Sequence, residues 1–233
     1  MKKLYQKDEV WFAVVWILAY VIGTSIFDSF NTKLYTLVYH LILCSVIFVW
    51  IKKEHLLATY GLCKPTMDSK RVLYYLPLLI VVTCNLWFGV ELQYTIIESF
   101  YYVLSMLCVG FLEELLFRGF LFKAIRKDNL QTAIIITSLT FGIGHIVNLF
   151  NGSGADLLSN LCQIGYAITF GYLFVWIFIK TKSLVVCMLA HAILNMTSIF
   201  ANVEFLLQTN VQIIMSLMLF VVSLSYALYI KNA

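Results

Sequence analysis

Eight long apolar runs, almost free of charged residues, dominate this sequence. Backbone N–H and C=O groups inside a lipid bilayer have no water partners, so a chain can span it only as helices or as a closed barrel. A run of about 18 or more apolar residues has the length of one spanning helix. The sequence therefore predicts an all-α, polytopic helical bundle with eight transmembrane helices, at residues 10–27, 34–51, 72–90, 99–122, 130–150, 157–179, 183–203 and 205–230.

Composition places the whole chain in a membrane. Of its 233 residues, 62% are hydrophobic and 12% are charged, and the mean hydropathy is +0.90. A typical soluble domain carries about twice that share of charged residues. We therefore expect an integral membrane protein that forms a single membrane domain over residues 1–233. The first run is longer than the apolar part of a signal peptide and has no cleavage site, so we expect it to be retained.

The basic residues between the runs predict the orientation of the bundle. Lysine and arginine are retained on the cytoplasmic side of a membrane during insertion. With eight spans and a cytoplasmic N-terminus, all 16 basic residues are cytoplasmic except Lys33, which falls outside, and Arg118, which lies within a span. Both termini are therefore expected in the cytoplasm. The net charge of +4 reflects this topology and contact with anionic lipids, and it does not indicate a nucleic-acid partner.

Charged residues within one run form the first candidate cluster. Glu113, Glu114 and Arg118 lie in FLEELLFRG, inside run 99–122. A charge in the bilayer costs about 3 kcal/mol or more, so such residues are by default functional candidates that face an interior cavity. Glu114 and Arg118 have the i, i+4 spacing of an ion pair on one helix face. Glu113 points about 100° away and has no partner nearby in the sequence, which suits a general base.

Two further clusters lie in later runs. His145 ends the pattern FGIGH, in which Gly142 and Gly144 would let another backbone approach beside the imidazole. His191 and Asn195 are again i, i+4 and would project into the same space. An imidazole and a carboxamide can donate hydrogen bonds to an oxyanion. With the unpaired glutamate, these groups suffice for peptide hydrolysis by activated water, without a nucleophilic serine or cysteine.

The three motifs together resemble a known family. EExxxR, FxxxH and HxxxN occur in this order in the fourth, fifth and seventh runs, and ATYGLCKP precedes the third run. This arrangement is similar to the CAAX protease and bacteriocin-processing family (CPBP or Abi) of intramembrane endopeptidases, related to the type II CAAX prenyl endopeptidases. The resemblance covers about residues 101–200, and the motif-bearing core is expected at about 99–203.

The resemblance implies three kinds of role: water activation by Glu113 and His145, oxyanion stabilisation by His191 and Asn195, and support of the site by Glu114 and Arg118. It implies a glutamate-type mechanism without a cofactor, a peptide or membrane-anchored protein as substrate, and a place in the plasma membrane of a bacterium. Two histidines and a glutamate leave zinc open, although the sequence has no HExxH motif. The six cysteines are scattered and have no metal-site spacing.

Two other functions stay open at this point. A non-catalytic bacteriocin immunity or scaffold protein of the same fold would carry the motifs without using them. A proton-coupled transporter would use Glu113 and the histidines as a relay, although the sequence shows no pair of broken helices. No motif indicates a particular substrate, cleavage site or oligomeric state.

Overall fold

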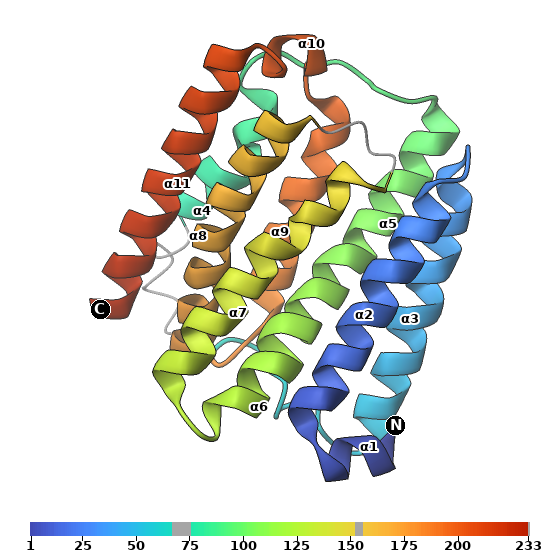
Figure 1. The fold of residues 1–233 in the computed structure, drawn as a ribbon, viewed down its shortest axis with the longest axis vertical. Helices are drawn as coiled ribbons and strands as arrows, with labels where there is room; N and C mark the ends of the chain where they lie inside the picture. Colours follow the sequence, from blue (N-terminus) through green and yellow to red (C-terminus); the bar gives the residue numbers. More distant parts are fainter. Residues whose placement is uncertain (67–75, 152–155, 233) are drawn as a thin grey trace.

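A computed structural model describes residues 1–66, 76–151 and 156–232. The regular structure in these ranges is helical, and the helices pack side by side in one bundle (Figure 1). Strand-like pairing within the same ranges is limited to an isolated antiparallel bridge between Val90 and Ala201. The predicted all-α class is therefore confirmed.

Six helical stretches in the described ranges are long and apolar enough to cross a membrane. They support an integral membrane protein, as the composition predicts. In chain order they are α2 (Glu9–Asp28), α3 (Lys33–Lys53), the continuous stretch of α5 (Ile96–Glu114), η3 (Leu115–Leu121) and α6 (Phe122–Arg126), then α7 (Leu130–Gly144) with η4 (His145–Leu149), α8 (Leu157–Thr181) and α11 (Thr209–Asn232).

Two of the eight predicted spans contain shorter described helices, and residues 72–75 of the first of these spans lie outside the described residues. Run 72–90 contains α4 (Leu76–Thr83) and η2 (Cys84–Leu86), and run 183–203 contains α9 (Val185–Thr197) and η5 (Ser198–Phe200). Their apolar helical stretches, Pro77–Leu86 and Val185–Phe200, fall below the length of the other six. Two very short helices, α1 (Lys2–Lys7) and α10 (Val203–Leu206), lie outside the runs or at their edge.

Polar caps fix where helices begin. The Asp8 side chain accepts a hydrogen bond from the Trp11 N–H at the start of α2, and Asn129 does the same for Thr132 at the start of α7. Such a cap satisfies an N–H group that has no partner within the helix, and contributes about 1 kcal/mol. These caps set helix starts that agree closely with the apolar runs.

One end of the bundle is rich in basic residues. Here Lys2 pairs with Glu54 (Nζ to Oε2, 2.8 Å) and Lys127 with Glu9 (Nζ to Oε1, 2.6 Å). These pairs join the start of the chain and of α2 to the ends of α3 and α6. The end of α8 is also here, because its Thr181 carbonyl accepts a hydrogen bond from the loop that follows α3. This basic end also carries the basic residues in the last turns of α3, α6 and α8: Lys52, Lys53, Lys123, Arg126 and Lys180.

The shorter helix α9 runs from the basic end to the opposite end. Leu184, immediately before α9, donates its N–H to Gly61 O in the loop after α3 (2.8 Å). Beyond α9, Ile199 O accepts a hydrogen bond from the N–H of Gln93 (3.1 Å), in the loop that leads into α5 at the opposite end. α4 packs against α9 and α11. The chain therefore crosses the bundle at α9 although this helix is short.

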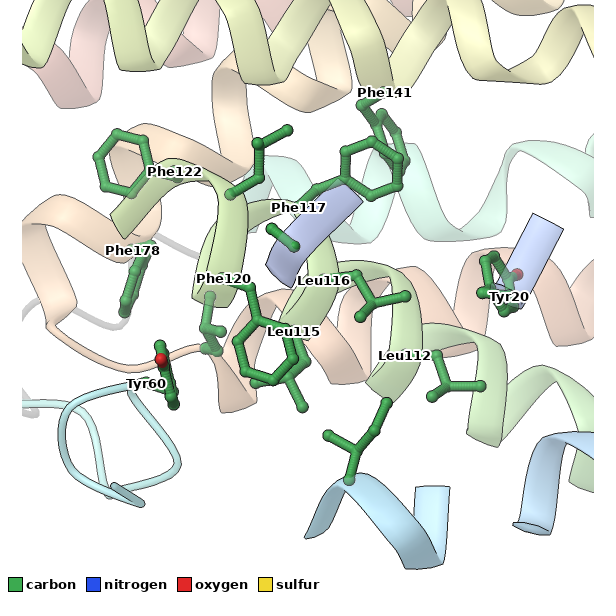
Figure 2. Packing of buried hydrophobic residues seen from close by; sticks show 14 of the residues in the cluster. Tyr20, Tyr60, Leu112, Leu115, Leu116, Phe117, Phe120, Phe122, Phe141 and Phe178 are labelled. Atoms are coloured by element: carbon green, nitrogen blue, oxygen red, sulfur yellow. The ribbon is translucent and has the colours of Figure 1, made fainter. Parts of the chain in front are cut away.

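The long central stretch changes from α-helix to π-helix at its middle. All seven residues of η3 (Leu115–Leu121) are buried, and η3 packs against α2 and α7. Figure 2 shows this cluster: Phe117 packs edge-on against Phe141 of α7 (5.3 Å between ring centres), and Phe120 against Tyr60 (4.8 Å). A π-helical segment widens a helix locally and often occurs at functional sites. Here it directly follows the two adjacent glutamates.

Candidate functional site

The carboxylate of Glu113 lies between two other helices. Its Oε1 accepts a hydrogen bond from the hydroxyl of Tyr20 on α2, at 2.6 Å. Its Oε2 lies 3.6 Å from Nε2 of His191 on α9. The Glu113 side chain keeps 15% of its surface exposed, whereas that of Glu114 keeps none. Glu113 is therefore positioned by neighbours and still accessible, as a general base must be.

Glu114 contacts two other motif residues. Its Oε1 accepts hydrogen bonds from Nη1 of Arg118 at 3.2 Å and from Nδ1 of His191 at 2.9 Å. The predicted ion pair is therefore present, although the backbone between its partners is π-helical. Because an ionised carboxylate only accepts hydrogen bonds, Nδ1 of His191 carries a proton. Glu114 thus orients His191, which helical spacing alone did not predict.

Arg118 is buried against an aromatic ring. Its side chain is fully buried, and the guanidinium carbon lies 3.9 Å from the centre of the Phe141 ring. Such a cation–π contact is worth about 2 kcal/mol when desolvated. Phe141 also packs edge-on against His145 and His191, with ring centres 5.3 and 5.7 Å away. The phenylalanine of FxxxH is therefore the common neighbour of all three clusters.

His145 lies where α7 changes into η4. Its Nδ1 contacts Phe141 O at 3.0 Å, and because a carbonyl only accepts hydrogen bonds, this nitrogen carries the proton. In the neutral imidazole, Nε2 is then free to accept a hydrogen bond. Asn160 of α8 donates to the His145 backbone oxygen at 2.8 Å and holds this turn in place. His145 is therefore fixed, half-buried and able to hold a water molecule.

Glu113 and His145 line the same cavity. Its volume is about 100 Å³, and its walls come from α2, from α5 with η3, and from α7 with η4. Phe117, Phe141 and Thr24 contribute to the wall. A volume of this size has room for water. The structure therefore joins the first two clusters at a site with room for water.

The third cluster is only partly joined to this cavity. His191 contacts both glutamates, as described above. Asn195 lies one turn later on α9 and is half-buried. Among the described residues that line the cavity, neither His191 nor Asn195 is found. The structure thus brings His191 to Glu113, and it does not place the Asn195 carboxamide at the same cavity wall.

A glycine allows the close approach of α5 and α9. At Gly110, one turn before Glu114, an added Cβ would lie 2.7 Å from Met188 O and 2.9 Å from Ala192 N. A side chain at this position would push the two backbones apart. Gly110 therefore helps to bring His191 within reach of the glutamates.

The two glycines of FGIGH differ in role. At Gly142 an added Cβ would lie 2.7 Å from the backbone nitrogen of Ile168 on α8, so the predicted close approach is confirmed there. At Gly144 nothing lies within 4 Å of such a Cβ, so the prediction is wrong for this residue. Gly144 lines the cavity instead. Its missing side chain leaves space beside His145.

A protein zinc site usually has three or four protein ligands. Within the described ranges, no group of three or more His, Cys, Asp or Glu side chains is arranged to hold a metal ion. His191 approaches Glu113 from α9, and His145, at the start of η4, lines the same cavity as Glu113. The donor set does not fit a metal in this arrangement, and we derive no step through one.

Sequence reasoning missed Tyr20. It lies 93 residues before Glu113, in an apolar run that contains no motif. Tyrosine is common in membrane helices, so its presence carried no signal. Only the packing of α2 against η3 brings it to the site.

Comparison with known proteins gives a family for the motif-bearing part. Residues 95–197 match the family described as type II CAAX prenyl endopeptidase Rce1-like. This segment contains every motif residue from Glu113 to Asn195, and the match confirms the predicted resemblance. The family is one of proteases, which supports peptide hydrolysis. No curated protein matches the sequence.

Proposed function

We propose that this protein is an intramembrane endopeptidase of the glutamate type, which hydrolyses a peptide bond of a small peptide or a membrane-anchored protein. The observation that carries the proposal is the cavity shared by Glu113 and His145, which come from different helices. A positioned carboxylate and a free imidazole nitrogen are the groups that activate water. The Rce1-like segment supports a peptide bond as the bond that is broken.

In the proposed reaction, a water molecule lies between the Glu113 carboxylate and Nε2 of His145. Glu113 removes one proton as the water oxygen attacks the carbonyl carbon of the peptide bond. The tetrahedral intermediate then collapses, the carbon–nitrogen bond breaks, and the protonated Glu113 gives its proton to the leaving amine. The carboxylate is regenerated, and one water molecule is consumed for each bond.

The charge on the carbonyl oxygen needs donors in the intermediate. We assign this role to Asn195 and to the imidazolium form of His191, in which Nε2–H can donate while Nδ1–H bonds to Glu114. The assignment rests on the family resemblance and on the contact between His191 and Glu113. Glu114 keeps His191 oriented through Nδ1, as carboxylates commonly do for functional histidines. Arg118 compensates the buried charge of Glu114.

We also propose that the chain crosses the membrane eight times, with both termini in the cytoplasm. The basic end supports this orientation, because positively charged loops are retained in the cytoplasm. Green fluorescent protein fused after residue 233 should fluoresce, and alkaline phosphatase fused after Asn151 should be active. Inactive phosphatase at Asn151 would contradict this orientation.

We propose that the protein lies in a bacterial plasma membrane. We also propose that it holds no resident metal, which metal analysis of the purified, active protein tests. Small peptides such as bacteriocin or signalling precursors, and membrane-anchored regulators, fit this setting.

The function is tested by comparing the membrane and secreted peptidomes of cells that produce the wild-type protein or the Glu113→Gln variant at equal levels. We expect peptides with new ends only in wild-type cells, together with loss of their precursor. Identical peptidomes would favour a non-catalytic protein. A proton-coupled flux that Glu113→Gln abolishes, without any cleavage, would favour a transporter.

A further inference from the structure

Tyr20 contacts the proposed base from outside the segment that matches the protease family. Its hydroxyl donates a 2.6 Å hydrogen bond to Oε1 of Glu113, and only 6% of the residue is exposed. It also lines the cavity shared by Glu113 and His145. The segment that matches the family therefore includes Glu113 but not Tyr20, which bonds directly to it.

The Tyr20 ring is itself held in place. It packs at 5.7 Å against the ring of His40 on α3, which is fully buried. His40 contacts Thr24 of α2 through Nε2 (2.9 Å) and Ser105 of α5 through Nδ1 (2.8 Å). This polar chain links α2, α3 and α5 beside the cavity. Tyr20 is therefore a fixed donor and not a mobile side chain.

The two oxygens of Glu113 have different surroundings. Oε1 is occupied by the Tyr20 hydroxyl, while Oε2 lies 3.6 Å from His191, beyond ordinary hydrogen-bond distance. A glutamate side chain has several rotamers, so without such a contact its carboxylate would adopt several orientations relative to the water molecule. The hydroxyl of Tyr20 restricts the carboxylate to one orientation and leaves Oε2 as the oxygen that takes the proton from water.

We infer that Tyr20 is a positioning residue that holds Oε1 of Glu113 and so aims the base at its water molecule. The inference rests on the proposed function. It predicts a specific kinetic effect: loss of the hydroxyl slows the chemical step and leaves substrate binding unchanged. A tyrosine that only helps α2 to pack against η3 would change stability instead.

The test uses the purified full chain in lipid vesicles with two internally quenched peptides of CAAX sequence, one farnesylated and one unmodified. Tyr20→Phe removes only the hydroxyl. Tyr39→Phe is the matched control, because the Tyr39 hydroxyl also bonds to α2, at Ala19 O (2.5 Å), but contacts neither Glu113 nor the cavity wall. We expect kcat of Tyr20→Phe to fall about 10- to 100-fold with KM within about twofold. Tyr39→Phe should keep wild-type values, and both variants should melt at similar temperatures.

A second measurement needs no substrate. The infrared band of the Glu113 carboxyl group is identified as the band that disappears in Glu113→Gln. It should shift in Tyr20→Phe and stay in place in Tyr39→Phe, because only the first variant loses a hydrogen bond to this group.

The inference is overturned if the infrared band does not move in Tyr20→Phe, or if the kcat of this variant equals that of Tyr39→Phe. If the two variants have equal kcat but cleavage by the wild-type protein still requires Glu113, the proposed function holds and only the inference about Tyr20 fails. Absence of any Glu113-dependent cleavage, in the peptidomes as well as with both peptides, overturns the proposed function, and this inference with it.

Discussion

Replacing Arg118 by methionine is expected to destabilise the protein by about 3–5 kcal/mol, the usual effect of removing one partner of a buried ion pair. The Glu114 carboxylate would remain fully buried without its cation, and its Oε2 already has no hydrogen-bond partner among the described residues. The contact of the guanidinium with the Phe141 ring would also be lost. Thermal unfolding of the purified protein in detergent measures this effect.

Two comparisons make this prediction specific. Lys127→Met breaks the exposed pair with Glu9 and should cost less than about 1 kcal/mol. The double variant Glu114→Gln with Arg118→Met removes both charges, so it should be more stable than Arg118→Met alone. If Arg118→Met and Lys127→Met lower the melting temperature by the same amount, the buried pair of Glu114 and Arg118 does not stabilise the protein as predicted.

The sequence predicted most of the helices because the bilayer leaves little choice. Apolar length alone identified α2, α3, α7 with η4, α8 and α11 within a few residues. It overestimated the regular helix at the end of run 72–90 and at both ends of run 183–203, where the described helices stop short of the runs. In the second of these runs, α9 packs between α4 and α5. The length of such a helix depends on the helices around it as well as on the thickness of the bilayer.

Residues close in the chain were the predictable part of the site. The i, i+4 spacing of Glu114 and Arg118 predicted their contact correctly. The contacts of Glu113 with Tyr20 and His191, and of Glu114 with His191, depend on how α2 packs on η3 and how α9 packs on α5. No local pattern encodes this packing. The π-helical turn after Glu114 also had no signal in the motif. Spacing therefore paired Glu114 with Arg118, but it could not pair residues that lie on different helices.

The central claim, that Glu113 is the base for peptide hydrolysis, is tested most directly by the rate at which the purified protein in vesicles cleaves the quenched peptides. Gln has nearly the same shape as Glu but cannot accept the proton. General-base catalysis typically contributes 10²- to 10⁴-fold, so Glu113→Gln should reduce kcat by roughly that factor. The variant should stay folded, because Gln can still accept the Tyr20 hydrogen bond.

Glu91→Gln is the control, because Glu91 is exposed and lies in the loop before α5, away from the cavity. It should cleave at the wild-type rate and melt at the same temperature as Glu113→Gln to within a few degrees. We predict that Glu113→Gln retains less than about 1% of the wild-type kcat. Cleavage by folded Glu113→Gln at a rate close to that of Glu91→Gln would contradict the account.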